Sequence, residues 1–466
     1  MKKYELIVIG TGPAGEKAAV KAAYFGHSVA IIEKGDLFGG AEVVTGTLPS
    51  KTLRETALFF SGKYEKGLYS IDRNLQHRAS IDDFMYRRKL VTTKEADEIH
   101  VNLMRHGVDI YYGTASFATA HVIDIAGKTP ASIYGDTILI ATGSYPYHPP
   151  QIPFDNKRVH DSDTILQIDR FPSSLCIVGG GVISCEYATI FATMGVKVYL
   201  VNDKESLLPF VDKEVTQELV SQMTNSGIKI YFNTKIESVT AEDKKPVQAT
   251  LATGEILAVD MFLYATGRSG NTRDLHCEKI GLTTDKREQL AVDKSYRTAV
   301  PNVYAVGDVI GFPALASTSM DQGRVAVAHI FQTEDLTTLP HYFPYGIYTI
   351  PEISMVGLTE EQVKEQQIPY CVGKTRYTDL ARGRIMGASG GFLKLILKKS
   401  DLTIIGVHII GHIASELIHY GVELVENQKN LYYLIGRIFN YPTLHDLYKY
   451  AAYDGLSNLS GHKIKP

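Results

Sequence analysis

The chain has 466 residues, with 48 basic and 51 acidic side chains and an ordinary hydrophobic fraction of 44%. The near-neutral charge argues against nucleic acid as the main partner, and no apolar run approaches the about 18 residues of a membrane span. We therefore expect roughly three globular domains and a cytoplasmic location.

The cysteines give no sign of a disulfide framework or of a metal site. They are Cys176, Cys185, Cys277 and Cys371, and none belongs to a C-x-x-C pair. Cys176 falls in an apolar strand and Cys185 in the helix after it, so both are expected to be buried, inert thiols.

The first predicted unit binds a dinucleotide. Residues 4–9 read as a buried strand, followed by the turn GTGPAG at residues 10–15, an alanine-rich helix, a strand at residues 28–32 and then Glu33. Such glycines let a backbone approach a pyrophosphate at a helix N-terminus, and a terminal acid can bind ribose hydroxyls. The alternative is a structural turn that binds no ligand.

The stretch GGAEVVTGTLPSK at residues 39–51 follows this unit. Pro49 suits a helix first turn and fixes the direction of Lys51. Taken alone, Lys51 is a solvated surface charge, but its place just after the dinucleotide motif suggests a position beside a bound ring. Residues 54–105 read as mostly helical with a loop near residues 63–80, and strands then lead to ATG at residues 141–143. Prolines at positions 146, 149, 150 and 153 mark a linker.

The pattern then repeats. A strand at residues 175–178 precedes GGGVIS at residues 179–184, a helix, and a strand at residues 197–201 that ends at Asn202. Asn202 stands as far after Gly179 as Glu33 stands after Gly10, so the chain holds two dinucleotide-binding units in series. Ser184 replaces the third glycine, and we expect it to loosen the packing of helix on strand without removing the phosphate site.

The remaining segments complete the predicted order. VYAVGD at residues 303–308 is a strand that ends in an acid, and a helix begins near Leu315. Asp308 is either a helix cap or a ligand for a cofactor hydroxyl. Strands and amphipathic helices from residue 343 onward predict a third, α+β domain.

Taken in order, these motifs resemble the flavoprotein disulfide reductases of the pyridine nucleotide-disulfide oxidoreductase family. The resemblance implies an α/β fold with two Rossmann-like, doubly wound dinucleotide-binding domains and an α+β C-terminal dimerisation domain. It places an FAD-binding domain at residues 1–146 and 270–341, an NAD(P)-binding domain at 147–269, and the dimerisation domain at 342–466.

The same resemblance implies the residues of the site. Those for FAD are Gly10, Gly12, Gly15, Glu33, Lys34, Gly39, Gly40, Lys51, Gly143, Gly307, Asp308 and Ala316. Those for the nicotinamide nucleotide are Gly179, Gly181, Asn202, Lys204 and Gly267. Lys51 and Glu186 would form an ion pair beside the flavin N5 and serve as the catalytic residues. The helix near Leu315 would point its N-terminus at the ring.

Two departures from the family pattern decide the predicted chemistry. The two redox cysteine positions hold Glu42 and Thr47, and the position of the C-terminal catalytic histidine holds Tyr441; His445 is out of register and reads as a surface residue. Thiol–disulfide exchange needs a thiolate, and a tyrosine with a pKa near 10 is a poor base at neutral pH. These departures and the GRSGNT text at residues 267–272 resemble the transhydrogenase branch of the family, which implies ping-pong hydride transfer between NADPH and NAD+ through FAD.

Asn202 and Val182 fit this interpretation. A neutral Asn202 does not repel the 2′-phosphate of NADP, nearby Lys204 attracts it, and a small Val182 leaves the nicotinamide face open; the alternative for Asn202 is a solvated turn residue. Two other functions stay open: an NAD(P)H diaphorase or oxidase that reduces quinones, dyes or oxygen, and a catalytically silent flavoprotein sensor. The expected partners are NAD(H) and NADP(H), and the expected assembly is a homodimer or a higher homo-oligomer.

Overall fold

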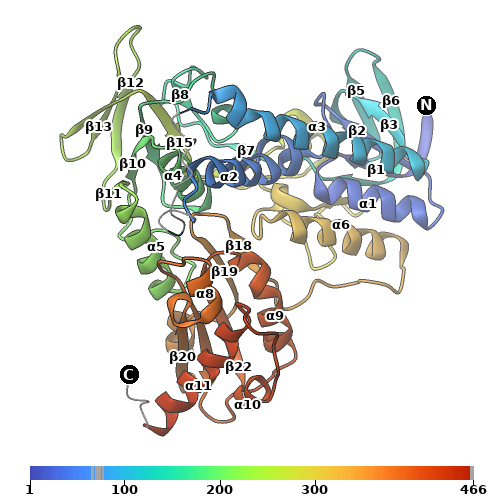
Figure 1. Ribbon diagram of the computed structural model, residues 1–466. Coiled ribbons are helices and arrows are strands. Elements are labelled where there is room, and N and C mark those ends of the chain that lie inside the picture. The colour runs from blue at the N-terminus through green and yellow to red at the C-terminus, as the bar shows by residue number, and fades with distance from the viewer. Residues whose placement is uncertain (65–67, 69–74, 76–77, 462–466) are drawn as a thin grey trace.

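The computed structural model describes residues 1–64, 68, 75 and 78–461. The predicted loop near residues 63–80 lies partly outside the described residues. Figure 1 shows two α/β regions side by side and a C-terminal region beneath them. This arrangement confirms the predicted fold class of two Rossmann-like units and an α+β unit. None of the helices among the described residues is long and apolar enough to cross a membrane.

The first region is built on a seven-stranded sheet with the order β3-β2-β1-β6-β5-β4, in which β17 also pairs with the C-terminal residues of β6. Strands β1, β2, β3, β6 and β17 are paired in parallel, whereas β4 and β5 form an antiparallel extension. The strand bounds are β1 Lys2–Ile9, β2 Val29–Glu33, β3 Asp109–Tyr112, β4 Thr114–Thr119, β5 Val122–Ala126, β6 Ala131–Ile140 and β17 Val303–Ala305.

Helices from distant parts of the sequence cover this sheet. The alanines of α1, Ala18, Ala19 and Ala22, are fully buried against the strands, which explains why small residues recur there. The helices of the first region are α1 Pro13–Tyr24, α2 Thr47–Ser61, α3 Ile81–Arg105 and α6 Ala316–Phe331, of which α2 packs on α3 and on α4 (Val182–Thr193). The predicted helix near Leu315 is therefore confirmed, since α6 begins at the next residue.

The second region repeats the design with the parallel order β11-β10-β9-β15-β8 and a separate three-stranded sheet β12-β13-β14. Its strands are β8 Val159–His160, β9 Ser174–Val178, β10 Lys197–Val201, β11 Lys229–Tyr231, β12 Ile236–Thr240, β13 Val247–Leu251, β14 Ile256–Val259 and β15 Met261–Tyr264. Its helices are α4 Val182–Thr193 and α5 Lys213–Asn225. The chain crosses between the regions twice, along the antiparallel pair β7 Ser144–Pro146 and β16 Arg268–Gly270.

The prediction about Ser184 was wrong. Its side chain is fully buried, and its hydroxyl donates a hydrogen bond to the carbonyl of Ala265 at 3.1 Å. At the equivalent place in the first region, a Cβ on Gly15 would lie 2.0 Å from the Gly10 carbonyl. Serine thus fastens α4 to the end of β15 instead of loosening the contact.

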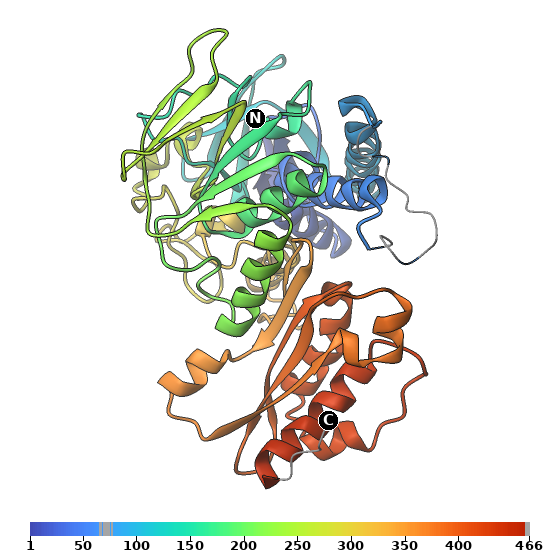
Figure 2. The same cartoon turned by 60° about the vertical axis from the view of Figure 1, so that its left-hand side comes forward.

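The C-terminal region is an antiparallel sheet with the order β18-β19-β22-β21-β20, and α9 and α11 pack on it. Figure 2 shows this region as a separate layered body below the other two. Its strands are β18 Tyr345–Ile347, β19 Glu352–Gly357, β20 Tyr370–Arg376, β21 Phe392–Lys398 and β22 Ile404–Gly411. Its helices are α7 Glu360–Glu365, α8 Ala381–Ile385, α9 Ala414–Glu426, α10 Leu431–Ile435 and α11 Asp446–Ser460.

One hydrophobic core joins the three regions. It contains Leu53 of α2, Phe84 of α3, Phe191 of α4 and Ile353 of β19, all nearly inaccessible to solvent. A buried ion cluster adds to this contact, because the Lys394 ammonium of β21 lies 2.9 Å from Asp212 at the start of α5. Since all three regions share this packing, side chains from each of them can be held at one site.

Candidate active site

The first glycine turn leaves the N-terminus of α1 open. Gly10 has φ 104°, and a Cβ there would lie 2.5 Å from the Ala141 carbonyl oxygen, so only glycine fits. Gly12 caps α1 without a side-chain hydrogen bond, and Pro13 occupies the first helical position, where a missing N–H costs nothing. The turn and the helix end together offer a surface that favours an anion.

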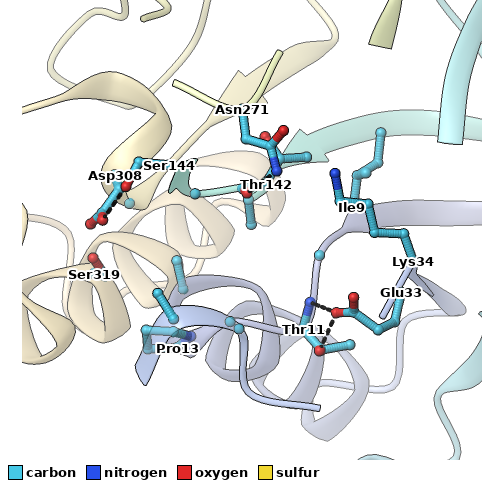
Figure 3. Close-up of a pocket in the computed structure, with 18 of the residues that line it drawn as sticks. Ile9, Thr11, Pro13, Glu33, Lys34, Thr142, Ser144, Asn271, Asp308 and Ser319 are labelled. Carbon is cyan, nitrogen blue, oxygen red and sulfur yellow. Dashed lines mark hydrogen bonds between the residues drawn. The ribbon is translucent and has the colours of Figure 1, made fainter. Parts of the chain in front are cut away.

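Glu33 stands at the end of β2 beside this turn. Its Oε2 accepts hydrogen bonds from the Thr11 amide at 3.0 Å and from the Thr11 hydroxyl, while its Oε1 accepts from the Gly35 amide at 2.7 Å. These bonds fix the carboxylate at the rim of the turn (Figure 3). A carboxylate held there can accept hydrogen bonds from a ribose diol.

A cavity lies over this turn (Figure 3). Most of the residues predicted for the flavin line it: Gly10, Gly12, Glu33, Lys34, Gly40, Gly143, Gly307, Asp308 and Ala316. Gly15 and Gly39 lie behind the wall, where a side chain would collide with the Gly10 carbonyl and with Val43 respectively. These two glycines permit close packing and do not face the cavity.

Several lining residues were not singled out from the sequence, among them Thr142, Ser144 and Asn271. The Ser144 hydroxyl donates to Asp308 Oδ2 at 2.8 Å, which orients that carboxylate (Figure 3). The Thr142 hydroxyl is buried and has no hydrogen-bond partner among the described residues. An orphaned polar group in a cavity wall indicates a polar ligand there. The repeated Ala-Thr-Gly motif, at residues 141–143 and 265–267, was the one sequence feature that indicated Thr142.

The segment before Lys51 forms a π-helical turn, Ala41–Thr45, and leads directly into α2. Glu42 and Thr47, which are five positions apart, both line the cavity. Burial raises the pKa of the Glu42 carboxyl, the Lys17 charge lowers it, and Glu16 and Glu95 raise it further, so that the net shift is upward. Among the described residues, no cysteine lines this cavity, and all four thiols are buried elsewhere.

Lys51 lies one helical turn beyond Thr47 on α2, which places both residues on the same face. Its ammonium contacts Glu186 of α4 at 2.9 Å and 2.8 Å, through both carboxylate oxygens. The main-chain amide of Tyr348 donates to Glu186 Oε1 at 2.9 Å, and the Tyr348 ring centroid lies 4.9 Å from the Lys51 ammonium. The predicted ion pair is thus present, and a third region of the chain supports it through Tyr348.

The second glycine turn lies at the carboxyl edge of the other parallel sheet. Gly179 has φ 122°, and a Cβ there would lie 2.6 Å from the Ala265 carbonyl oxygen, so the turn lies directly against the end of β15. Gly181 is exposed at the start of α4, and Gly267 follows β15. The strand order reverses between β9 and β15, which is where open α/β sheets bind ligands.

Asn202 and Lys204 differ in what they offer a ligand. Asn202 is 2% exposed, and its Nδ2 donates to the carbonyls of Lys204 and Ser206 at 3.1 and 2.9 Å. It is therefore a buried loop anchor and not the solvated turn residue of the alternative interpretation. Lys204 is exposed beside it. Val182, at the first position of α4, is partly buried.

Tyr441, at the position of the family's catalytic histidine, and the nearby His445 both lie in the C-terminal region. Tyr441 is 77% exposed and Ile438 is 95% exposed, in the segment between α10 and α11. His445 caps α11 and packs beside Tyr420 and Phe439, so it is only partly exposed.

Comparison with protein families gives two matches. The pyridine nucleotide-disulphide oxidoreductase family matches residues 4–323, and its dimerisation domain matches residues 343–452. Two relatives, both called soluble pyridine nucleotide transhydrogenase, cover 98% of this chain and 98% of their own length. The protein of Mycobacterium tuberculosis (strain ATCC 25177 / H37Ra) is 42% identical over 464 residues, and that of Pectobacterium atrosepticum is 39% identical over 461 residues.

Solved structures agree with this result. LpdA from Mycobacterium tuberculosis superposes with a TM-score of 0.88 at 26% identity, covering 97% of this chain and 99% of that one. The HOCl-induced flavoprotein disulfide reductase RclA from Escherichia coli superposes with a TM-score of 0.85 at 27% identity, covering 96% of this chain and 99% of that one.

Proposed function

Because the chain belongs to the pyridine nucleotide-disulphide oxidoreductase family, we propose that it is an FAD-dependent transhydrogenase, which transfers a hydride between NADPH and NAD+. The relatives that carry this activity in their names align over nearly the whole chain. The observation that carries the proposal is the cavity wall between Gly40 and Lys51. It presents Glu42 and Thr47 and no thiol among the described residues, so it offers no acceptor for thiol–disulfide exchange.

The residues of the first region fit FAD. Gly10 and Gly12 leave room for a pyrophosphate at the start of α1, and Glu33 presents a fixed carboxylate for ribose hydroxyls. The orphaned hydroxyl of Thr142 and the oriented carboxylate of Asp308 supply polar contacts along the cavity. When bound, FAD supplies the ring that takes up a hydride and returns it.

Two features of the chain would favour negative charge beside that ring. The Lys51 ammonium is held by Glu186, which fixes its direction. The N-terminus of α6 reaches the cavity through Ala316 and Ser319, and no described side chain caps it, so its amides remain free. A helix N-terminus carries about half a positive charge, which adds to that of Lys51. These groups orient and stabilise without changing covalently.

The nicotinamide nucleotides would bind in the second region, in the crevice between the ends of β9 and β15. Gly179 and Gly181 would receive the pyrophosphate at the N-terminus of α4. Asn202 places a neutral, buried side chain at the end of β10, so the usual acid is missing at that position, and Lys204 supplies a positive charge close to it, between the exposed Asp203 and Glu205. One site would then accept NADPH and NAD+ in turn, which is a ping-pong order.

We further propose the boundaries 1–146 and 270–341 for the FAD domain, 147–269 for the nucleotide domain and 342–466 for the interface domain. The paired crossings β7 and β16 support the two inner boundaries. The apolar side chains of Ile438 and Tyr441 are exposed within the match to the family's dimerisation domain, which supports a homodimer through that face.

Anaerobic turnover tests the function. Purified FAD-loaded enzyme is mixed with NADPH and thionicotinamide-NAD+, and formation of the reduced analogue is followed by its absorbance. We expect steady analogue reduction that depends on both nucleotides. Bleaching of FAD absorbance by NADPH with no analogue reduction contradicts the proposal, and rapid oxygen consumption in an aerobic control then favours the oxidase.

A further inference from the structure

A loop of the first region reaches across to the edge of the second sheet. The turn at residues 285–289 is held by Asp285, whose Oδ1 accepts hydrogen bonds from the amides of Arg287 and Gln289, each at 2.8 Å. The Arg287 carbonyl in turn accepts from the Gly270 amide at 2.8 Å, which ties the turn to β16. The loop therefore presents the Arg287 side chain from a fixed backbone.

The Arg287 guanidinium lies on Gly267. A Cβ at Gly267 would stand 2.4 Å from one of its nitrogens, so any larger residue would displace the arginine. The same nitrogen donates to the Arg268 carbonyl at 3.4 Å, and the guanidinium carbon lies 5.8 Å from the Tyr147 ring centroid. Tyr147 is itself hydrogen-bonded through its amide to the Gly267 carbonyl. The absence of a side chain at Gly267 thus leaves the space that the Arg287 guanidinium occupies.

Gly267 and the guanidinium that lies on it are at the crevice between β9 and β15. Ala265, two residues before Gly267, contacts both the Gly179 turn and the Ser184 hydroxyl. Arg287 therefore lies on the strand end that forms one wall of the predicted nucleotide crevice. Lys204 lies on the opposite side of this crevice, because it follows β10, which is the neighbour of β9 away from β15.

The charge of Arg287 is uncompensated, unlike that of a neighbouring arginine. Among the described residues, no carboxylate lies within ion-pair distance of the Arg287 guanidinium, which is exposed to solvent. Arg273 also lies over a tyrosine ring, that of Tyr145 at 4.8 Å, but Glu288 neutralises it at 2.9 Å. The free guanidinium has donors left for an anion, since it carries five N–H groups in a planar fork.

We propose that Arg287 binds the pyrophosphate of the nicotinamide nucleotide, which makes it a substrate-binding residue supplied by the other dinucleotide domain. This inference rests on the proposed function. Its place beside Gly267 assigns it to the pyrophosphate and not to the 2′-phosphate, because the adenosine end of the nucleotide belongs at β10, next to Lys204. Arg287 should therefore serve NAD(H) and NADP(H) equally.

The test is calorimetric titration of oxidised, FAD-loaded enzyme with NAD+ and with NADP+, which bind without reacting. We compare the wild-type chain with Arg287→Gln, Arg287→Lys and the matched control Arg273→Gln. Arg287→Gln should weaken both nucleotides by the same factor of about ten, as expected for loss of a charge-assisted hydrogen bond. Arg287→Lys should retain part of the affinity, and Arg273→Gln should change little. FAD content and melting temperature establish that each variant is folded.

Each other outcome overturns the inference. Unchanged affinity in Arg287→Gln means that the arginine only caps the Arg268 carbonyl. A loss confined to NADP+ assigns it to the 2′-phosphate, and an equal loss in Arg273→Gln reduces it to a general charge effect. If the wild-type chain binds neither nucleotide, the proposed function fails as well; if it binds both and Arg287→Gln is unaffected, this inference alone fails.

Discussion

The Lys51 ammonium contacts both carboxylate oxygens of Glu186 across 135 positions of sequence, at 2.9 and 2.8 Å. Glu186 is 4% exposed, so its charge depends on this partner and on the Tyr348 amide for compensation. The pair joins α2 of the first region to α4 of the second, and Tyr348 adds a contact from the third. A positive charge is thereby fixed one helical turn beyond the cavity wall at Thr47.

Lys51→Met should slow bleaching of the FAD absorbance by NADPH by about 100- to 1,000-fold while FAD stays bound. A fixed positive charge beside the reacting centre is lost, and such electrostatic contributions have this magnitude. Anaerobic stopped-flow absorbance measures the rate. The control is Lys89→Met on the exposed face of α3.

The same substitution leaves Glu186 buried and unpaired, which is destabilising in itself. The double variant Lys51→Met with Glu186→Gln separates the two effects. It should recover stability but not the rate. Full recovery of the rate would show that Lys51 has only a structural role.

Tyr348→Leu should slow the same step about 2- to 30-fold, because it removes the ring that faces the Lys51 ammonium. Cation–π contacts contribute about 0.5–2 kcal/mol, which corresponds to that range. The main-chain hydrogen bond to Glu186 remains in the variant. Tyr348→Phe keeps the ring and should react at nearly the wild-type rate; a Phe variant as slow as the Leu variant would point instead to the hydroxyl.

Sequence reasoning located the parts of the site that follow from local geometry. The glycines at positions 10 and 179 require positive φ, and Glu33 follows directly from the end of a strand, so a short pattern identifies each one. Tyr348 and Arg287 have no such pattern, because each reaches the site from a segment that packing brings near. Ser184 was misjudged for the same reason: its partner, the Ala265 carbonyl, lies 81 positions away. The sequence therefore predicted the local turns, whereas it did not predict the contacts between regions.

Asn202→Asp should raise the KM for NADPH about tenfold and that for NADH much less, because an acid at this position repels a 2′-phosphate. It also removes the two hydrogen bonds that Nδ2 donates to the carbonyls of Lys204 and Ser206. Steady-state kinetics with each nucleotide measures the selectivity. Lys204→Gln keeps both loop hydrogen bonds and removes only the charge near the 2′-phosphate, so it should raise the KM for NADPH without loop damage. A parallel loss for both nucleotides in Asn202→Asp would indicate loop damage alone.

Lys394→Met should lower the free energy of unfolding by about 3–5 kcal/mol, the usual cost of leaving a buried carboxylate unpaired. Lys394 is 1% exposed and holds Asp212 at 2.9 Å and Glu360 at 2.6 Å. Urea unfolding followed by circular dichroism measures the change, since the chain has no tryptophan.

The matched control for this cluster is Lys364→Met. Lys364 pairs with the same Glu360 at 2.8 Å, but on an exposed helix surface. Exposed pairs of this spacing contribute about 0.3–0.5 kcal/mol, so the control should change stability by that little. Equal effects of the two substitutions would show that the buried cluster does not hold the second region to the C-terminal region.

Glu42→Gln should stabilise the protein at neutral pH and have no advantage in acid. Burial raises the pKa of Glu42 above its usual 4.5, so the native state holds the proton more tightly than the unfolded chain. The wild-type protein therefore loses stability as the pH rises from about 4.5 through the native pKa, and the loss is constant above it. A glutamine has no proton to release and avoids that loss. Calorimetry measures the melting temperatures of wild type and variant between about pH 4 and pH 8, with and without FAD. The melting temperature of Glu42→Gln should rise above that of wild type as the pH rises. The control is Glu98→Gln on the exposed face of α3. A variant that is less stable than wild type at the highest pH would mean that the ionised Glu42 is itself bound in the fold.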